Sequence, residues 1–224
     1  MDRRESLTRF LESYPGAGVI PEHAVKVFLR EAGLPAPDGI YLPVGASLPY
    51  YSRLSYPLVA KVFSSRIRSK SDVGGVRLGL SDSAGVTAAV ADLMGIENAE
   101  GVILEEQAQP GTEVIVGGII DPQFGPVVMF GLGGVFVELY RDVAFALAPM
   151  TRDDAFCLME RVKGYRLLTG YRAAPPRDRD ALANILVIVS ELMATGLLEE
   201  IDLNPVALYP HGAMILDAKM LSVV

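Results

Sequence analysis

The sequence has 224 residues, of which 50% are hydrophobic, and carries a formal net charge of −7. This length allows one large domain or two smaller ones that share a core. The acidic balance argues against nucleic acid as a partner, because a duplex-binding protein needs a basic face. One cysteine and two histidines exclude an internal disulfide, a cysteine-based zinc site and a histidine-rich metal site.

Nothing in the sequence points to a membrane or to secretion. No apolar run approaches the roughly 18 residues that a membrane-spanning helix needs. The first ten residues, MDRRESLTRF, lack the apolar segment of a signal peptide. The sequence therefore predicts a soluble, cytoplasmic protein with no membrane partner.

The first half of the chain combines helices with two strands. Residues 21–33 have apolar residues at helical spacing, and Gly33 can end that helix. Residues 57–63 and 75–80 predict strands on either side of a basic loop. Residues 81–95 predict a short helix, with Ser81 or Asp82 as its cap.

Consecutive strands are predicted from residue 101 onwards, at 101–107, 112–120, 125–131, 134–140 and, with a weaker pattern, 143–147. Two helices follow. The first begins at Thr151, where Asp154 can complete a capping box, and it contains Cys157, for which we expect a buried, unreactive thiol. The second covers residues 180–196.

The last segment, residues 201–220, predicts two strands around a tight turn at 210–212. Strands and helices are mixed without regular alternation, which favours the α+β class. A change of pattern near residue 100 divides the chain into an N-terminal region, residues 1–100, and a second region, residues 101–224.

The loop at 64–75 carries several basic residues and a glycine pair. Lys61 lies on the preceding strand, Lys70 lies in the loop, and Gly74-Gly75 end it. Two lysines beside such a loop suit a polyphosphate. The alternative is that Lys61 reaches solvent from a strand edge and that the loop is merely solvated.

The usual phosphate-binding motifs are missing. The chain has no G-x-x-x-x-G-K-[ST] motif, and FGLGGVF at 130–136 lacks the G-x-G-x-x-G spacing. Gly133-Gly134 could bring backbone N–H groups close to a phosphate, or could form a bulge between two strands.

A magnesium site is suggested by the C-terminal strands. Asn204 and Asp217 lie at similar depth from the predicted turn, so their side chains can face one another, and Asp202 can join them. An amide oxygen and a carboxylate are the usual protein share of a Mg²⁺ site. The alternative is that Asp217 simply pairs with Lys219.

The chain resembles the ATP-grasp (β) subunit of ADP-forming acetate–CoA ligases, within the NDP-forming acyl-CoA synthetases. The resemblance is strongest in DPQFGPVVMFGLGGVFVE and IDLNPVALYPHGAMILDAKM, and it resumes in AKVFSSRIRSKSDVGGV and EHAVKVFLREAGLPAP. It implies an ATP-grasp fold, in which two α+β lobes clasp a nucleotide. Residues 1–100, with the basic loop, would hold the smaller lobe, and residues 101–224, with the metal-binding hairpin, the larger.

The resemblance also implies an activity. Such enzymes interconvert acyl-CoA, ADP and phosphate with free acid, CoA and ATP, through an acyl phosphate and a phosphohistidine. A CoA-binding α subunit or domain carries the phosphohistidine, and the grasp subunit binds ATP or ADP with Mg²⁺.

The roles of individual residues follow from the same resemblance. The residues implied are Lys61 and Lys70 for the phosphates (Lys70 also as the catalytic residue), Gly74 and Gly75 for the loop, Glu105 and Glu106 beside the adenine, Glu113 for the ribose, and Asn204 and Asp217 for Mg²⁺.

Two positions depart from the family pattern. Ser69 stands where the family commonly has a histidine that relays the phosphoryl group, and Ala146 stands where it often has an arginine, close to the Gly133-Gly134 turn. A serine hydroxyl does not replace an imidazole as a phosphoryl carrier. Three hypotheses follow: a working subunit that receives phosphate directly from its partner, a catalytically impaired binding or regulatory subunit, and an ATP-grasp ligase with a different acceptor.

Overall fold

The computed structural model of the chain describes residues 2–16, 18–48, 51, 53–67, 69–134, 142–172 and 174–223. By its internal contacts the chain divides into a larger unit, comprising Met1–Ile20, Phe28–Ala36 and Pro110–Val224, and a smaller unit, comprising Pro21–Val27 and Pro37–Gln109. No helix within the described ranges is long and apolar enough to cross a membrane.

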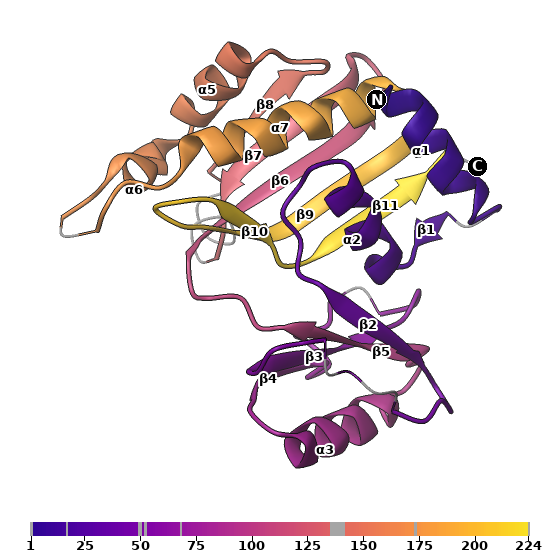
Figure 1. Cartoon of the computed structure of the whole chain (residues 1–224). Coiled ribbons are helices and arrows are strands. Elements are labelled where there is room, and N and C mark those ends of the chain that lie inside the picture. The colour runs from indigo at the N-terminus through magenta and orange to yellow at the C-terminus, as the bar shows by residue number, and fades with distance from the viewer. Residues whose placement is uncertain are drawn as a thin grey trace. The chain divides into compact units, whose positions relative to one another are not determined.

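The larger unit is built on an antiparallel sheet (Figure 1). β9, the longest strand among the described residues, pairs with three neighbours, β6, β10 and β11. The seven strands found in the described residues are β1 (Val19–Ile20), β11 (Ala218–Ser222), β9 (Leu198–Leu208), β6 (Thr112–Asp121), β7 (Gly125–Leu132) and β8 (Val143–Leu147) in spatial order, with β10 (Ala213–Ile215) beside β9.

Helices complete the larger unit. α7 (Arg179–Ala194) lies along the sheet and buries an apolar face against it (Figure 1). The other helical segments are α1 (Arg3–Glu12), the end of α2 (Glu22–Glu31), α5 (Arg152–Glu160), a 3-10 turn at Lys163–Tyr165 and α6 (Arg166–Thr169).

The predicted start of α5 is confirmed, because Thr151 and Asp154 form a capping box there. The expectation of a buried thiol at Cys157 is wrong. Ala155, Leu158 and Met159 form the buried face of α5, and the helical repeat turns Cys157 away from them into solvent.

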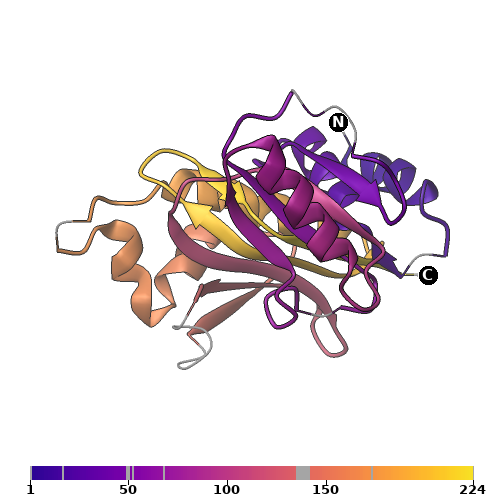
Figure 2. The same ribbon diagram turned by 90° about the horizontal axis from the view of Figure 1, so that it is seen from below.

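The smaller unit is an antiparallel sheet with one helix packed on it (Figure 2). In the described residues its strand order is β2 (Gly39–Pro43), β5 (Gly101–Glu106), β3 (Leu58–Phe63) and β4 (Val76–Leu80). α3 (Ser83–Met94) begins after the Asp82 cap and packs Val86 and Leu93 against Leu58 and Leu104. The first turns of α2 also belong to this unit.

The structure confirms the α+β class, and it differs from the predicted elements in particulars. The strand at 101–106, expected with the second half of the chain, pairs with β2 and β3 in the smaller sheet. The C-terminal segment forms three strands, since the chain leaves β10 at Ile215 and pairs again as β11 from Ala218. Residues 135–140 of the strand predicted at 134–140 lie outside the described residues.

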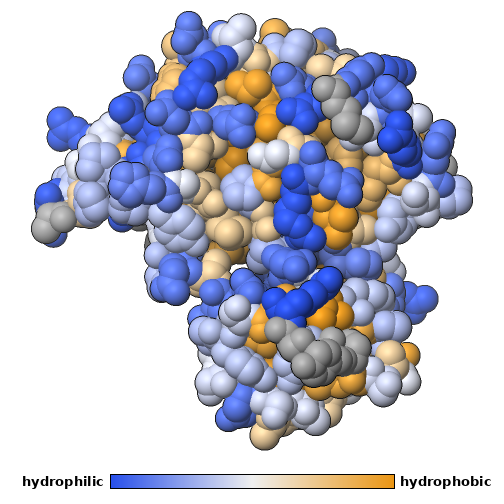
Figure 3. Space-filling view, viewed as in Figure 1, coloured by the Kyte–Doolittle hydropathy of each residue, from blue (hydrophilic) through white to orange (hydrophobic). Residues whose placement is uncertain are grey.

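Burial of apolar side chains accounts for the hydrophobic composition. Hydrophilic residues cover much of the face shown in Figure 3, with apolar residues between them. The buried residues with charged side chains in the described ranges, Glu22, Lys26, Lys61, Glu105 and Asp142, are therefore the informative exceptions.

Candidate phosphate and metal sites

Four of these exceptions, joined by Lys70, form a buried charge cluster in the smaller unit: Glu22, Lys26, Lys61, Lys70 and Glu105. Lys26 Nζ lies 2.7 Å from Glu22 Oε1 and 2.7 Å from Glu105 Oε1. Lys61 Nζ lies 2.9 Å from Glu105 Oε2 and 3.9 Å from Glu22 Oε1. Lys70 Nζ lies 2.8 Å from Glu22 Oε2. Three ammonium groups and two carboxylates thus meet in one place.

Local structure explains how these side chains meet. Glu22 and Lys26 are four residues apart on α2, so they share one face of the helix. On the sheet, Val59 lies directly opposite Glu105, and Lys61 is two residues further along β3. Because alternate residues share a face, Lys61 and Glu105 are diagonal neighbours on the side that α2 faces.

The glycine pair fixes the loop that carries Lys70. The Gly75 N–H donates to the Lys70 carbonyl at 2.6 Å, and the Gly74 N–H donates to the Ser71 carbonyl at 3.0 Å. Gly74 has a φ of 61°, which favours glycine, and a Cβ on Gly75 would collide with the Val62 side chain. Both glycines are therefore required by the tight turn that holds the Lys70 backbone.

Opposite charges favour the ionised forms of Glu22 and Lys26 despite their burial. Burial alone would raise the pKa of the Glu22 carboxyl, but Lys26, Lys61 and Lys70 outweigh it and hold that pKa far below its ordinary value. Burial would lower the pKa of Lys26, but Glu22 and Glu105 outweigh it and raise that pKa. The cluster carries a net charge of +1, with most of its positive charge already neutralised internally.

The structure gives the contacts of three predicted site residues of the smaller unit, Lys61, Glu105 and Glu106. Lys61 is only 9% exposed and is ion-paired, so the solvated alternative is wrong for this side chain. Glu105 is ion-paired in the cluster, whereas Glu106 accepts the Ser55 N–H at 2.7 Å. These two neighbours on β5 face opposite sides of the sheet, and their roles beside an adenine remain predictions.

The sequence analysis missed Glu22 and Lys26. A signal was present, because these two charges lie four residues apart on a helix whose other residues on that side include Val25 and Leu29, both fully buried. A charged residue on the apolar side of a helix requires a partner of opposite charge.

The larger unit contains a second charged region, the acidic strand face, formed by Glu200, Asp202 and Asn204 on β9 with Asp217 and Lys219 on or beside β11. The Asn204 N–H donates to the Asp217 carbonyl at 3.2 Å, so these two residues are direct neighbours as the sequence predicts. Lys219 forms an ion pair with Glu200 at 2.9 Å.

This face accumulates negative charge. Burial, followed by the nearby charges of Glu200 and Asp217, raises the pKa of Asp202 to about 6. A hard cation would relieve this repulsion, and the carboxylate of Asp217 with the amide oxygen of Asn204 suits Mg²⁺. Among the described residues no three His, Cys, Asp or Glu side chains form a metal site by themselves. Any Mg²⁺ here would take its remaining ligands from water and phosphate.

The remaining predicted residues lie around β6 and β7. Glu113 is exposed, and its carbonyl accepts the Gly133 N–H at 2.7 Å. A Cβ on Gly133 would lie 2.9 Å from the Glu113 carbonyl carbon, which explains the glycine. The Gly133 N–H thus continues the β6–β7 pairing by one residue, and the roles suggested for the glycine pair remain predictions. Gly134 follows with a φ of 63°.

The expected proximity of Ala146 to the glycine turn is wrong. Ala146 lies opposite Val128 on β7, and Gly133 is five residues further along that chain. At about 3.3 Å per residue this separates the two positions by roughly 16 Å.

Comparison with known proteins identifies the family of the chain. Residues 14–221 match the family model described as an ATP-grasp domain. A relative from Pyrococcus furiosus, the beta subunit of acetate–CoA ligase [ADP-forming] I, is 38% identical over 211 residues, covering 89% of this chain and 90% of the relative. Acetate–CoA ligase [ADP-forming] II of Archaeoglobus fulgidus is 40% identical over 200 residues, but this chain spans only 30% of its length.

Solved structures agree with the sequence relatives. The dinucleotide-forming acetyl-coenzyme A synthetase 1 of Ca. Korarchaeum cryptofilum, in complex with coenzyme A, Ca-AMPCP and HgCl⁺, gives a TM-score of 0.86 at 36% identity, covering 98% of this chain and 99% of that chain. A second structure of this synthetase contains coenzyme A and Mg-AMPPCP, with its phosphohistidine segment pointing towards the nucleotide binding site. It gives a TM-score of 0.83 at 37% identity, covering 99% of this chain and 100% of that chain. The chain therefore belongs to the ATP-grasp family, among the relatives of the beta subunits of ADP-forming acetate–CoA ligases.

Proposed function

We propose that this chain is the nucleotide-binding subunit of an ADP-forming acid–CoA ligase, which interconverts acyl-CoA, ADP and phosphate with free acid, CoA and ATP. The observation that carries the proposal is the meeting of Lys61 and Lys70 in one buried cluster beside the Gly74-Gly75 turn. The partner would be a CoA-binding subunit or domain that carries the phosphohistidine. Related chains support this division of labour, since one is a separate beta subunit and another is part of a chain about three times longer.

The chain's own groups suit phosphoryl transfer. Lys61 and Lys70 would bind the phosphate oxygens of ADP or ATP, and Lys70 would neutralise the charge that develops as the phosphoryl group moves. Asn204 and Asp217 would hold Mg²⁺, which neutralises phosphate charge when bound. Glu113 would accept hydrogen bonds from the ribose hydroxyls, with Glu105 and Glu106 on the strand beside the adenine.

Ser69 favours direct delivery of the phosphoryl group by the partner. Its Oγ accepts the Asp72 N–H at 3.3 Å, which is a contact within the loop. In this role the serine shapes the loop while the partner's phosphohistidine passes its phosphoryl group to the β-phosphate oxygen of ADP, breaking the N–P bond and forming an O–P bond. The impaired-subunit alternative has no support among the relatives, which are named as ligases or ligase subunits.

Calorimetric titration of the full chain with ADP, with and without Mg²⁺, tests the proposal. We expect ADP to bind more tightly with Mg²⁺, and we expect Asp217→Ala to lose that gain, about tenfold or 1.4 kcal/mol. Asp153→Ala, an exposed aspartate on α5, serves as the control and should retain the full Mg²⁺ effect.

Two results would contradict the assignment. If Asp217→Ala kept the wild-type Mg²⁺ dependence, Asp217 would have no place in the metal site. If ADP bound neither the chain alone nor the chain with its CoA-binding partner, the proposed function would be wrong.

A further inference from the structure

Glu22 is the anion that occupies the two lysines of the proposed phosphate site. Its Oε2 lies 2.8 Å from Lys70 Nζ, while its Oε1 lies 2.7 Å from Lys26 Nζ and 3.9 Å from Lys61 Nζ. A phosphate that takes Lys70 must therefore replace a carboxylate oxygen already bound there. The inference drawn from this contact rests on the proposed function of the site.

We propose that Glu22 is a specificity-determining residue: an internal anion that a ligand must displace from Lys70, so that the site accepts phosphate groups and rejects singly charged anions. The displacement exchanges one anion for another. Acetate or chloride carries a single negative charge, as Glu22 does, and would gain no electrostatic energy from the exchange. A terminal phosphate carries about −1.5 to −2 at neutral pH, as a phosphate monoester does, and would gain.

The burial of the cluster identifies Lys70 as the member that changes partner. The Lys70 side chain is 20% exposed, whereas those of Glu22 and Lys26 are 5% and 2% exposed. A ligand from solvent therefore reaches Lys70 first. Glu22 does not become an isolated buried charge when Lys70 leaves it, because Lys26 remains bound to its other oxygen.

The other carboxylate of the cluster, Glu105, binds Lys26 and Lys61. Both oxygens of Glu105 accept hydrogen bonds from Lys26 at 2.7 and 2.9 Å, and Oε2 also accepts one from Lys61 at 2.9 Å. Glu105 thus holds the two more deeply buried lysines, whereas Glu22 forms the 2.8 Å ion pair with Lys70.

The test measures ADP affinity and anion selectivity in Glu22→Gln, using the full chain. Glutamine keeps the side-chain length but removes the competing charge. We expect ADP to bind about tenfold more tightly. We also expect sodium acetate and sodium chloride, used as monoanion probes, to compete with ADP at lower concentrations than they do against the wild type.

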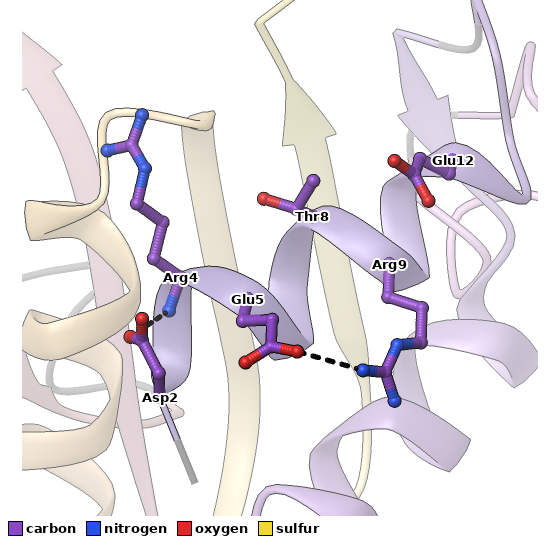
Figure 4. Close-up of a pocket in the computed structure, with 6 residues that line it drawn as sticks. All are labelled: Asp2, Arg4, Glu5, Thr8, Arg9 and Glu12. Carbon is purple, nitrogen blue, oxygen red and sulfur yellow. Dashed lines mark hydrogen bonds and ion pairs between the residues drawn. The ribbon is translucent and has the colours of Figure 1, made fainter.

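Glu5→Gln is the matched control. Glu5 also pairs with a cation four residues along a helix, at 3.1 Å from Arg9, but this pair is on the exposed surface of α1 (Figure 4). The same chemical change there should alter neither ADP affinity nor the competition by acetate. A second variant, Glu22→Asp, keeps a negative charge on this face of α2 but shortens the side chain by one methylene, which weakens its hold on Lys70, and it should also bind ADP more tightly.

The outcomes separate this inference from the proposed function. Tighter ADP binding with stronger monoanion competition in Glu22→Gln, or in Glu22→Asp if the first variant fails to fold, would support the inference. Unchanged or weaker ADP binding in a folded variant would overturn it and leave the proposed function intact. Absence of ADP binding by the wild type, alone or with its partner, would overturn both.

Discussion

The two charged regions of the molecule differ in how their charges are balanced. In the buried charge cluster of the smaller unit, each ammonium group has a carboxylate within hydrogen-bonding distance, and Lys26 and Glu105 are each 1% exposed. In the acidic strand face of the larger unit, carboxylates lie near one another with Lys219 as the cation paired to Glu200.

The direction of the pKa shifts expresses this difference. Three lysines hold the pKa of Glu22 below its ordinary value, so its charge is stabilised in the folded chain. Burial and two neighbouring carboxylates raise the pKa of Asp202 to about 6, so its charge is destabilised. Under the proposals above, the first region exchanges an internal anion for a ligand, whereas a cation bound at the second would relieve the repulsion between its carboxylates.

The substitution with the largest expected effect on stability is Lys26→Met. It removes the cation that lies between two buried carboxylates, and removing one partner of a buried ion pair costs about 3–5 kcal/mol. Chemical denaturation followed by circular dichroism should show this loss as a lower midpoint.

The corresponding control in the larger unit is Lys219→Met. Its ion pair with Glu200 has side chains 48% and 32% exposed, and exposed pairs contribute under about 1 kcal/mol. Equal destabilisation by the two substitutions would show that the buried cluster is no more tightly coupled than the acidic strand face.

A smaller effect is expected from Lys70→Ala, which tests the exchange of anions in the cluster. Loss of one charge-assisted contact to phosphate should weaken ADP binding by about 10- to 100-fold, equivalent to about 1.4–2.8 kcal/mol. The fold should persist, because this lysine is the most exposed member of the cluster.

Arg66→Ala in the same loop controls for general loss of positive charge. The Arg66 side chain is exposed and contacts Asn98 at 3.4 Å, so we expect little change in ADP affinity. If the two substitutions weakened ADP binding equally, the loop would act through its overall charge, and Lys70 would have no special role.

Much of the fold could be predicted because local signals determine it. The Thr151–Asp154 capping box, the cap at Asp82 and the strands on either side of the basic loop are short-range features. The pairing of β5 with β2 and β3 could not be predicted, because strand partners are chosen by contacts distant in sequence. The same holds for the division of the C-terminal segment into β10 and β11.

The site shows the same limit. Lys61 and Lys70 could be selected from their neighbourhood in the sequence, and the register of β9 and β11 does place Asn204 beside Asp217. The partners of the lysines could not be selected. Glu22 is 39 residues before Lys61, and only the packing of α2 near β3 and β5 makes it their counter-ion. Charge pairing in a core depends on tertiary contacts, although the i,i+4 pair of Glu22 and Lys26 on α2 was a local indication of it.

The last prediction concerns pH, and it tests whether Glu22 is held charged by the three lysines. Its folded pKa lies below the ordinary 4.5, so ionisation of Glu22 stabilises the fold above that pH, and this contribution is lost as pH falls from 4.5 towards the folded value. Glu22→Gln has no such group. The difference in unfolding free energy between wild type and variant should therefore shrink by about 1.4 kcal/mol for each pH unit below 4.5 over which Glu22 remains ionised in the fold. Urea denaturation at pH 7, 4.5 and 3 measures this change. Glu5→Gln, whose side chain is 66% exposed, should show a much smaller change. A constant difference for Glu22→Gln across this range would mean that the lysines do not stabilise its charge, and the contrast with the acidic strand face would disappear.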